Sequence, residues 1–345
     1  MIRYDDVFTY ENLLKAYHHC RKGKRTRRNV IDYEVSITRN LMKLYHDLNN
    51  RNYKIGNLYQ FEIYEPKHRD VVANCFADKI VQRIICQEIL LPAISPLLIF
   101  DNYATQPGKG TDLARNRFGE FLKRYYRYNK TNHGYILRCD ISKYFGTIDR
   151  QILFNMIKKL NIDDDCKNII KTQIYSYQPD SPIGVCIGFQ TVQWLAVYYL
   201  NGLDHYIKEQ LHIKFYGRYM DDFYLIHPDK EYLKYCLFEI QNYLSTLNIR
   251  LNDKTEIHKL SEPTNWLGFH YRLDDSSKVT IRITKQSVRR YIKRIRRFKK
   301  LFDQDRISSD TIEQSFASVT DHVSKATDGK EIVKKIEKAA RKAFY

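Results

Sequence analysis

The sequence predicts an α+β fold, in which an antiparallel sheet carries helical additions. Short β-rich segments alternate with segments of helical periodicity through the middle of the chain. A tight turn that contains two adjacent aspartates joins two of these β-rich segments. The chain from Thr284 onward is helical and strongly basic, and residues 281–300 contain ten Lys or Arg and no acid.

The first part of the chain contains helical segments on either side of one predicted strand. Residues 8–50 have helical periodicity, interrupted by a run of six positive charges in eight residues (21–28). This run could hold structured RNA or an acidic partner. Residues 58–65 alternate as a strand does, and Pro66 ends the alternation. Two helices follow, one capped by Asp78 and one after a Gly-containing turn, over residues 78–91 and 112–126.

The second part of the chain contains the predicted sheet. Residues 134–141 form a short β-rich run that includes Asp140 near its end, and two further strands, 215–219 and 223–227, meet at Met220-Asp221-Asp222. The remaining predicted elements are two helices and one hairpin, over residues 194–210, 230–247, and 266–271 with 279–283.

The charge balance predicts a polyanionic partner. The chain has 58 Lys or Arg and 40 Asp or Glu, which gives a formal net charge of +18. A chain this basic is attracted to nucleic acid. Aromatic residues make up 14% of the chain, with 28 Tyr, and they suit either a surface that stacks on bases or a Tyr-rich core.

Membrane insertion and secretion are not predicted. The mean hydropathy is −0.55, no uninterrupted apolar run approaches the roughly 18 residues of a membrane span, and the first residues lack the apolar block of a secretory signal. The seven cysteines are widely spaced, with no C-x-x-C pair. This spacing favours reduced, buried thiols in a cytoplasmic protein over structural zinc or a disulfide framework.

Asp140 and the pair Asp221-Asp222 are the candidate catalytic residues. Strands distant in sequence can lie side by side in an antiparallel sheet, which would bring the three carboxylates together. Such a cluster repels itself unless a cation neutralises it, and its hard oxygen ligands favour Mg²⁺. Two such ions about 4 Å apart support in-line phosphoryl transfer. Taken alone, the Asp-Asp pair is also compatible with a solvated hairpin turn.

Four motifs in sequence order resemble those of reverse transcriptases. The similarity spans about residues 55–275, and the Y-x-D-D tetrad is only one part of it. The motifs are Leu137-Arg-Cys-Asp140-Ile-Ser-Lys-Tyr-Phe145, Ile187-Gly188-Phe-Gln-Thr-Val192-Gln193, Tyr219-Met-Asp221-Asp222 and Asn265-Trp266-Leu267-Gly268-Phe269.

The resemblance implies a right-hand polymerase with fingers, an antiparallel palm sheet with helices, and a helical thumb. It divides the chain into an N-terminal basic helical extension (1–54), fingers with part of the palm (55–134), palm (135–283) and thumb (284–345). The implied activity is RNA-directed DNA synthesis with two Mg²⁺ ions, or Mn²⁺ in their place, acting on an RNA template and a DNA product.

The resemblance also implies a role for individual residues. Asp140, Asp221, Asp222 and the Ile141 carbonyl would bind the metals, and Phe145 would exclude the 2′-hydroxyl of ribonucleotides. The other implied nucleotide contacts are Lys67, Arg69, Gly188, Gln193 and Lys254. Trp266, Leu267 and Gly268 would grip the primer end. The implied duplex-binding face of the thumb consists of Arg289, Arg290, Lys293, Arg294, Arg296 and Arg297. The simpler interpretations are a core aromatic for Phe145, a charged turn for Lys67 and Arg69, a surface lysine for Lys254 and a solvated helix face for the thumb cations.

Within this family the sequence is most similar to bacterial enzymes of the group II intron-like branch, and especially to those of diversity-generating retroelements. The Ile187-Gly188 to Gln193 pattern is associated in that group with tolerant copying of template adenines, although Val192 departs from the usual Ser. A neighbouring interpretation is an antiphage-defence reverse transcriptase with a dedicated non-coding RNA. The resemblance also allows two further protein partners: a small helical accessory protein, which would favour the diversification role, or a second reverse transcriptase subunit.

Two other functions are compatible with the same motifs. The palm could be a catalytically inactive scaffold that binds nucleic acid, although all three acids and the aromatic gate are present. A DNA-templated or protein-primed polymerase would use the same chemistry at the metals. Residues after 284 show no H-N-H or C-x-x-C endonuclease pattern.

Overall fold

The structure, a computed structural model, describes residues 1–64 and 68–344. The chain forms two compact units, and each is described by itself. The first unit consists of Met1–Gly110, Arg138–Leu225 and Lys234–Glu256, and the second of Thr111–Leu137, Ile226–Leu233 and Ile257–Tyr345. The four-part division inferred from the family resemblance stays a prediction.

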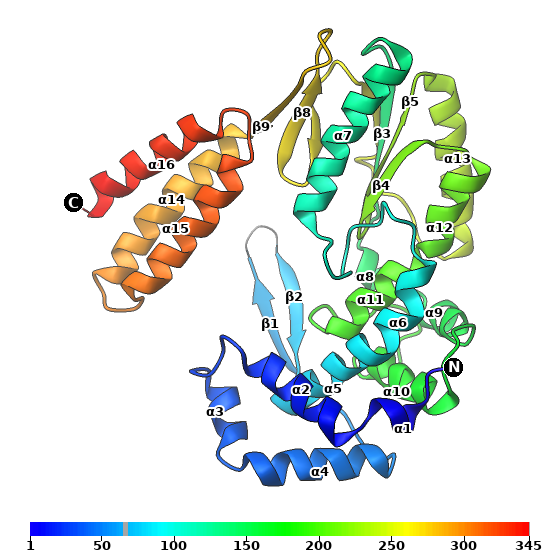
Figure 1. Cartoon of the computed structure of the whole chain (residues 1–345), viewed down its shortest axis with the longest axis vertical. Coiled ribbons are helices and arrows are strands. Elements are labelled where there is room, and N and C mark those ends of the chain that lie inside the picture. The colour runs from blue at the N-terminus through cyan, green and yellow to red at the C-terminus, as the bar shows by residue number, and fades with distance from the viewer. Residues whose placement is uncertain (65–67, 345) are drawn as a thin grey trace. The chain divides into compact units, whose positions relative to one another are not determined.

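The first unit begins with helices that agree with the predicted helical segment and its interruption. The side chain of Thr9 caps the second of them by accepting a hydrogen bond from the Asn12 amide at 3.2 Å. The basic run separates the second helix from the third. The four helices are α1 (Tyr4–Val7), α2 (Tyr10–Arg21), α3 (Arg28–Glu34) and α4 (Ile37–Asn49) (Figure 1).

An antiparallel two-stranded ribbon follows, made of β1 (Tyr59–Ile63) and β2 (Arg69–Ala73). Its register pairs Phe61 with Val71. Every residue of β1 is exposed, whereas β2 includes the buried Val72. The ribbon therefore presents one strand to solvent and attaches to the unit through the other.

A continuous helical segment, Phe76–Leu97, crosses the core of the first unit. It comprises α5 (Phe76–Ile84), a π-helical stretch (Ile85–Leu90), α6 (Leu91–Ile94) and a 3₁₀ turn (Ser95–Leu97). By length and composition alone this segment could span a membrane. Most of its large apolar residues are buried in the protein, with Ile80 and Ile89 fully inaccessible, whereas Leu97 at its end is exposed. Packing in the core therefore accounts for most of its apolar composition.

The central sheet has four strands in the order β4-β5-β3-β6. Its strands are β3 (Tyr135–Asp140), β4 (Phe215–Tyr219), β5 (Asp222–His227) and β6 (Glu256–Lys259). The helices between and after these strands are α8 (Tyr144–Thr147), α9 (Arg150–Ile157), α10 (Asp164–Tyr175), α11 (Gln190–Tyr199), α12 (Asn201–His205), a π-helical stretch (Tyr206–Gln210) and α13 (Lys230–Thr246).

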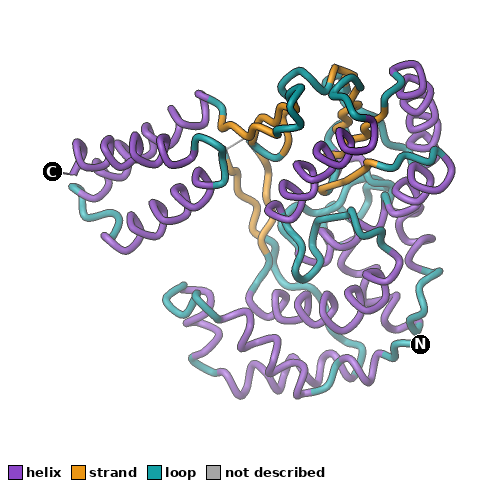
Figure 2. The backbone as a smooth tube through the Cα atoms, turned by 45° about the horizontal axis from the view of Figure 1, so that its top comes forward, coloured by secondary structure: helices purple, strands orange, loops and turns teal. Residues whose placement is uncertain are grey.

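The second unit combines a long helix, a small sheet and a helical bundle. In its sheet, β8 pairs antiparallel with both β7 and β9, and Tyr271 faces Ile281 across one pair. The last three helices pack on one another, as Figure 2 also shows. The elements are α7 (Thr111–Asn129), β7 (Thr264–Trp266), β8 (Phe269–Leu273), β9 (Val279–Ile283), α14 (Lys285–Phe302), α15 (Ser309–Ser324) and α16 (Gly329–Phe344).

Tyrosines occupy both the core and the surface. Tyr125, Tyr199 and Tyr216 are fully buried, and their hydroxyl groups donate to the His133 carbonyl, the Leu247 carbonyl and Asp204, each at 2.6 Å. Tyr59 and Tyr64 are exposed. The interpretation as a Tyr-rich core is therefore confirmed, and the base-stacking surface stays a prediction. Among the described residues no cysteine forms a disulfide, and only Cys75 is not buried.

Candidate active site

Asp140 is the last residue of β3, and Asn252 holds it in two ways. The Asn252 amide donates to the Asp140 carbonyl at 2.7 Å. The Asn252 side-chain amide donates to Asp140 Oδ2 at 3.3 Å. Asp140 is half-buried, so its carboxylate is oriented by a neighbour and still reaches solvent.

The backbone just after Asp140 leaves a carbonyl available. Ile141 forms an antiparallel bridge with Leu251. The two hydrogen bonds of this bridge use the Asp140 carbonyl and the Ser142 amide. The bridge therefore does not use the carbonyl of Ile141, which lies beside the Asp140 carboxylate in the chain.

The acidic turn lies next to β3. The turn uses Met220 with φ 56°, and Asp222 begins β5, which is the direct neighbour of β3 in the sheet. Arg138 Nη2 on β3 lies 4.0 Å from Asp222 Oδ1. Burial first, and then the charges of Asp222 and Asp140, raise the pKa of the Cys139 thiol well above its usual value. The end of β3 and the start of β5 thus share one electrostatic environment.

The charge of Asp221 also affects a residue close to Asp140 in the chain, Tyr144. Burial raises the pKa of Tyr144, and the negative charge of Asp221 adds to this effect while Arg218 opposes it. Tyr144 follows Asp140 by four residues, on the short helix α8. The structure therefore brings all three predicted carboxylates to one edge of the central sheet.

A buried ion pair that the sequence analysis did not single out supports the acidic turn. Arg218 and Asp204 are fully buried, with Nε–Oδ1 and Nη2–Oδ2 distances of 2.7 and 2.6 Å. Arg218 Nη1 also donates to the Met220 carbonyl at 2.9 Å. This bidentate pair joins α12 to the backbone of the turn that carries Asp221.

The loop that contains Gly188 lies against β2. Gly188 has φ 125°, and a Cβ atom there would come within 2.3 Å of the Val72 carbonyl oxygen, so only glycine fits. The Val72 amide donates to the Ile187 carbonyl at 2.9 Å. Arg69 is exposed at the start of the same strand. Lys67 lies outside the described residues.

Phe145 is tied to the same loop through its backbone. The Val185 amide donates to the Phe145 carbonyl at 2.8 Å, and the Gly184 amide donates to the Ile148 carbonyl at 2.8 Å. The Phe145 side chain is partly exposed, and its ring centroid lies 5.6 Å from that of Tyr144. Phe145 is therefore not a fully buried core residue, and its role as a gate stays a prediction.

Val192 and Gln193 are neighbours in the first turn of α11 and differ in exposure. Gln193 is exposed, whereas Val192 is buried with 1% of its surface accessible. Helix α11 begins at Gln190, four residues before the predicted start. The departure from Ser at position 192 thus changes a core contact and leaves the exposed side of the turn unaltered.

Lys254 is exposed, and hydrogen bonds through Asn252 link its backbone to the side chain of Asp140. Its backbone amide donates to Asn252 Oδ1 at 3.1 Å, and the side chain of Asn252 donates to Asp140 Oδ2. The same asparagine therefore orients both the carboxylate and the turn that carries the lysine.

The donors gathered at this edge fit a divalent cation. They are carboxylate oxygens together with a backbone carbonyl, which are hard ligands of the kind that Mg²⁺ prefers. Arg138, at the same edge, also forms an ion pair with Glu256, with an Nη1–Oε1 distance of 3.8 Å. A metal ion would stabilise carboxylates that otherwise repel one another.

The predicted primer grip lies in the second unit. Trp266 is 1% exposed, and its indole N–H points to the Ala114 carbonyl at 3.4 Å. In the turn that follows, Leu267 is half-buried and Gly268 is exposed, with φ 45° and 87°. Arg115 Nε and Nη2 donate to the Leu267 carbonyl at 3.1 and 3.0 Å, a contact that the sequence analysis missed.

The predicted duplex-binding cations all lie on α14, also in the second unit. The side opposite them faces the protein, with Ile295 buried. Arg290 donates to Ser287 Oγ at 3.0 Å, and Arg294 stacks on Phe298 at 5.2 Å. The six predicted residues are exposed: Arg289, Arg290, Lys293, Arg294, Arg296 and Arg297.

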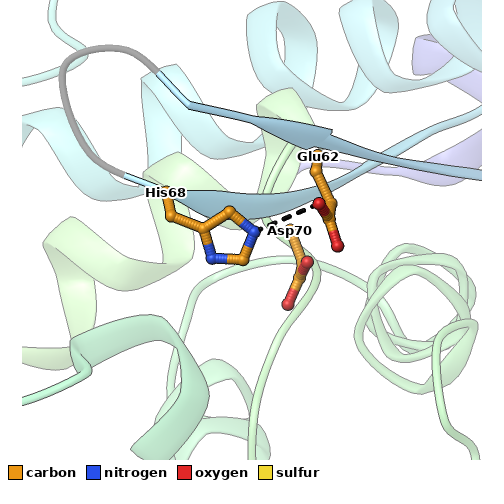
Figure 3. A group of neighbouring side chains, drawn as sticks. All are labelled: Glu62, His68 and Asp70. Carbon is orange, nitrogen blue, oxygen red and sulfur yellow. Dashed lines mark ion pairs between the residues drawn. The ribbon is translucent and has the colours of Figure 1, made fainter.

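A further group of side chains on the β1–β2 ribbon resembles a metal site. Ligand atoms of Glu62, His68 and Asp70 lie within 4.8 Å of one another (Figure 3). Glu62 faces Asp70 across the ribbon, and His68 Nε2 lies 3.4 Å from Glu62 Oε2. All three side chains are exposed, so water can hydrogen-bond to their polar atoms. We therefore interpret the group as a surface ion pair between His68 and Glu62, with Asp70 nearby.

Comparisons with known proteins agree with this geometry. A family model described as reverse transcriptase (RNA-dependent DNA polymerase) matches residues 65–271. A search of the curated proteins found no match. Among solved structures, a telomerase from Candida albicans, in complex with a TWJ fragment of telomeric RNA, is similar with a TM-score of 0.51 and 12% identity.

That similarity covers 86% of this chain and 61% of the telomerase chain, so the chain spans about three fifths of that structure. At this identity the similarity concerns the fold alone. Together with the family match it confirms the predicted α+β fold with a polymerase-type palm and antiparallel sheets.

Proposed function

The chain belongs to the reverse transcriptase (RNA-dependent DNA polymerase) family, and we propose that it copies an RNA template into DNA by two-metal nucleotidyl transfer. The observation that carries this proposal is the gathering of Asp140, Asp221 and Asp222 at one edge of the central sheet. Oxygen ligands held in this way fit two Mg²⁺ ions and the triphosphate of a nucleotide.

Asp140, Asp221 and the Ile141 carbonyl would hold the metal ions, with Asp222 as an auxiliary acid. When bound, such ions activate the 3′-hydroxyl of the primer and neutralise charge on the phosphates. Asn252 orients Asp140, and the Arg218–Asp204 pair fixes the turn before Asp222. Positioning of this kind supplies most of the catalysis in phosphoryl transfer.

The residues around this edge would bind the incoming nucleotide. Arg69 would pair with the triphosphate, and the Phe145 ring would occupy the space of a ribose 2′-hydroxyl. Gly188 lets the loop backbone approach closely because no side chain intervenes. Gln193 is exposed toward solvent for contact with the nascent pair, and Lys254 would donate a proton to the leaving pyrophosphate.

We expect Asp221→Asn to lower nucleotide incorporation on a primed RNA by on the order of 10³-fold or more, because an amide cannot replace a charged metal ligand. Steady-state incorporation in Mg²⁺ measures the effect. The matched control is Asp180→Asn, which makes the same change at an exposed site. Undiminished incorporation by a folded Asp221→Asn protein would exclude the assignment and favour a non-catalytic scaffold.

The same assay separates RNA-templated from DNA-templated or protein-primed synthesis. Matched RNA and DNA templates, each with and without a primer, are compared in one preparation. Faster extension of the primed RNA supports the proposal. Extension of primed DNA alone, or equal extension without a primer, contradicts it.

The finer proposal is that the enzyme serves a diversity-generating retroelement. It is supported by the Ile187-Gly188 to Gln193 pattern and by the burial of Val192, which leaves the exposed side of that turn unaltered. Sequencing the RNA that copurifies with the protein, and the DNA made from it, tests the role. Substitutions concentrated at template adenines support it, whereas faithful copies of a dedicated non-coding RNA favour a defence role.

A further inference from the structure

The turn at Leu267 and Gly268 has a strained backbone and an open outer side. Leu267 has φ 45°, in the left-handed region that leucine rarely adopts. A Cβ atom at Gly268 would have no described atom within 4 Å beyond its chain neighbours, so this part of the turn borders open space. A strained turn keeps its shape only where surrounding contacts hold it.

Arg115, on α7, holds this turn by its backbone. Its Nε and Nη2 atoms both donate to the Leu267 carbonyl oxygen, at 3.1 and 3.0 Å. Bonds from a charged guanidinium are stronger than bonds between neutral groups, and only 13% of the Arg115 side chain is exposed to competing water. The carbonyl and the N–H of a trans peptide point in opposite directions. Arg115 therefore also directs the Gly268 N–H, which belongs to the same peptide group, away from α7.

The helix that carries Arg115 is packed against the hairpin that carries the turn. The Trp266 indole N–H points to the Ala114 carbonyl at 3.4 Å, and the Tyr271 hydroxyl lies 3.5 Å from the Arg115 carbonyl. The Phe118 ring packs on Trp266 and Tyr271, with centroid distances of 5.9 and 4.8 Å. All three aromatic side chains are buried. Arg115 thus stands on a support that packing fixes to β7 and β8.

One carboxylate links Arg115 to the C-terminal helical bundle (α14–α16). Asp112 lies one turn before Arg115, and its Oδ1 accepts a bond from Arg115 Nη1 at 3.1 Å. Asp112 Oδ2 accepts a bond from Lys325 Nζ at 2.8 Å. Lys325 directly follows α15 and also pairs with Asp321 at 2.9 Å. The bond from Lys325 is the main reason that the pKa of Asp112 is lowered, which shows that the carboxylate is charged in this link.

A second contact attaches the bundle to the edge of the small sheet. In the turn between α15 and α16, the Thr327 amide donates to the Ile281 carbonyl at 2.7 Å, and the Ile281 amide donates to Thr327 Oγ1 at 2.9 Å. A cavity of about 160 Å³ lies among these elements, and its lining includes Arg115, Ile281 and Lys325. Close packing is therefore incomplete here, and polar contacts determine how the bundle and the turn are placed.

We propose that Arg115 is a positioning residue for the primer end. By holding the Leu267 carbonyl, it directs the Gly268 N–H outward, where that group would donate to a phosphate of the primer strand. Through Asp112 and Lys325 it makes the placement of this donor depend on the C-terminal bundle. The proposal rests on the proposed polymerase function, because only an enzyme that extends a primer needs the primer end in one place.

Single-turnover extension of a primed RNA by the full-length protein tests the role of Arg115. The assay gives the maximal rate of nucleotide addition and the nucleotide concentration at half-maximal rate, and fluorescence anisotropy gives the primer–template affinity. We expect Arg115→Met to lower the maximal rate about tenfold to 100-fold and to change the other two quantities less than about twofold. Arg115→Lys should recover part of the rate, since lysine keeps the charge but lacks the guanidinium fork.

A modified primer separates positioning from a general effect on the fold. A methylphosphonate in place of the last phosphodiester of the primer removes the charge that the Gly268 N–H would contact. This primer should slow the wild-type protein, but it should slow Arg115→Met by less than about twofold more, because the contact is already lost. Full additivity of the two effects overturns the positioning role. The control is Arg124→Met, an exposed position on the same helix, which should behave as the wild type.

A double-mutant cycle tests the link to the bundle. Lys325→Met should lower the maximal rate about threefold in the wild-type background and leave the rate of Arg115→Met unchanged, because the two residues act through one pathway. Lys330→Met, at an exposed lysine at the start of α16, is the matched control. Hydrogen exchange over residues 264–269 follows the turn without catalysis, and both Arg115→Met and Lys325→Met should accelerate it.

Folding is checked by thermal melts of the same preparations. If Arg115→Met is unfolded at the assay temperature, Arg115→Lys takes its place in each comparison, with a smaller loss of rate expected. If the wild-type protein incorporates no nucleotide, the polymerase function fails and the role of Arg115 at a primer fails with it, while faster exchange in the variants still demonstrates the link between bundle and turn. If the wild type is active and the exchange is the same in all three proteins, the link is overturned and the polymerase function stands.

Discussion

Asp204 and Arg218 form the most deeply buried ion pair of the described chain, since both side chains are wholly inaccessible. Asp204 also accepts bonds from the Tyr216 hydroxyl at 2.6 Å and from the Asn102 side chain at 3.2 Å. Every oxygen of this carboxylate thus has a donor. Such a network holds a single geometry, which the turn at Met220 requires.

Removing one partner of this pair should destabilise the protein strongly. We expect Arg218→Ala to lower the free energy of unfolding by about 3–5 kcal/mol, because Asp204 would remain buried and uncompensated. Denaturant unfolding measures the change. Arg218→Lys should recover only part of the loss, since a lysine cannot make the bidentate contact.

Arg39→Ala is the matched control for that experiment, because Arg39 is exposed and its removal should change stability by less than about 0.5 kcal/mol. If Arg218→Ala were as stable as this control, the buried pair would not be a structural determinant of the acidic turn.

At the residue scale the sequence predicted the carboxylates better than their supports. Asp140 and Asp221 were found because each stands at the end of a β-rich segment within a recognisable motif. Arg218 and Asp204 belong to different elements, and no local pattern shows that they pair. Arg115 was missed for the same reason, since its partner, the Leu267 carbonyl, is 152 residues away.

At the scale of elements, α14 separates its charge from its apolar face. It has no acidic residue over Lys285–Phe302, and its buried residues are Ser287 and Ile295. Of its last-turn cations, Lys299 pairs with Asp303. The rest of the exposed face is suited to phosphates, which fix position without reading sequence.

Neutralising part of this face should flatten the salt dependence of duplex binding. For the triple variant Arg289→Gln, Lys293→Gln and Arg296→Gln we expect the slope of log affinity against log salt to fall by about 2.7, at about 0.9 per phosphate contact. Titrations with a primer–template duplex measure it. The control replaces three exposed lysines of α16, Lys330, Lys334 and Lys338, by Gln. An equal change in the control would indicate a net-charge effect only.

A histidine on α15 makes the second unit sensitive to acid. Burial, and then the charges of Arg115 and Lys325, lower the pKa of His322 below its usual value of 6.5. Its ring centroid lies 4.8 Å from that of Phe269. Because the unfolded chain takes up the proton more readily, the neutral histidine contributes its full stability above pH 6.5 and loses it as the pH falls below that value.

We therefore expect the midpoint of unfolding to decrease more steeply between pH 6.5 and pH 5 in the wild-type protein than in His322→Phe, which cannot take up a proton. Thermal melts across this range provide the measurement. Parallel pH profiles for the two proteins would show that His322 does not titrate on unfolding.

Secondary structure was predicted best where the periodicity was clear. Strands β3, β4 and β5 lie within one residue of their predicted bounds, and helix α7 lies within three residues of its own. Helices α9 and α10 were missed because they lie in a segment without a motif. Their caps were a usable signal, since Asp149 and Asp163 accept bonds from the amides of Ile152 and Cys166 at 2.9 and 2.8 Å.

At the scale of the whole molecule, the thiols show that the fold is held without covalent cross-links. Six of the seven cysteines are buried, and Cys75 is half-buried. Burial raises the pKa of Cys75 to about 11, so little of its reactive thiolate exists near neutral pH. Packing and hydrogen bonds carry the stability.

The native protein should therefore react slowly with a thiol reagent at pH 8, and the unfolded protein should react at all seven cysteines without added reductant. Colorimetric thiol counting before and after addition of denaturant tests this. A count that reaches seven only after reduction would reveal a disulfide.

The net charge of +18 was predictive of nucleic-acid binding in general, but it could not locate the binding surfaces. A basic cavity lined by Lys79 and Arg83, for example, is formed by three segments that are distant in the sequence. Composition cannot predict that these segments come together, because their contact depends on the tertiary fold.

Among residues 1–64 and 68–344 the β1–β2 ribbon pairs with no third strand, and all of β1 is exposed to solvent. Two-stranded hairpins are only marginally stable by themselves, so part of the binding energy of a substrate would be used to immobilise this one. We therefore expect the ribbon to contribute little to affinity and to release its substrate quickly between successive additions. A polymerase that must step forward after every nucleotide benefits from a contact that forms and dissolves with each cycle.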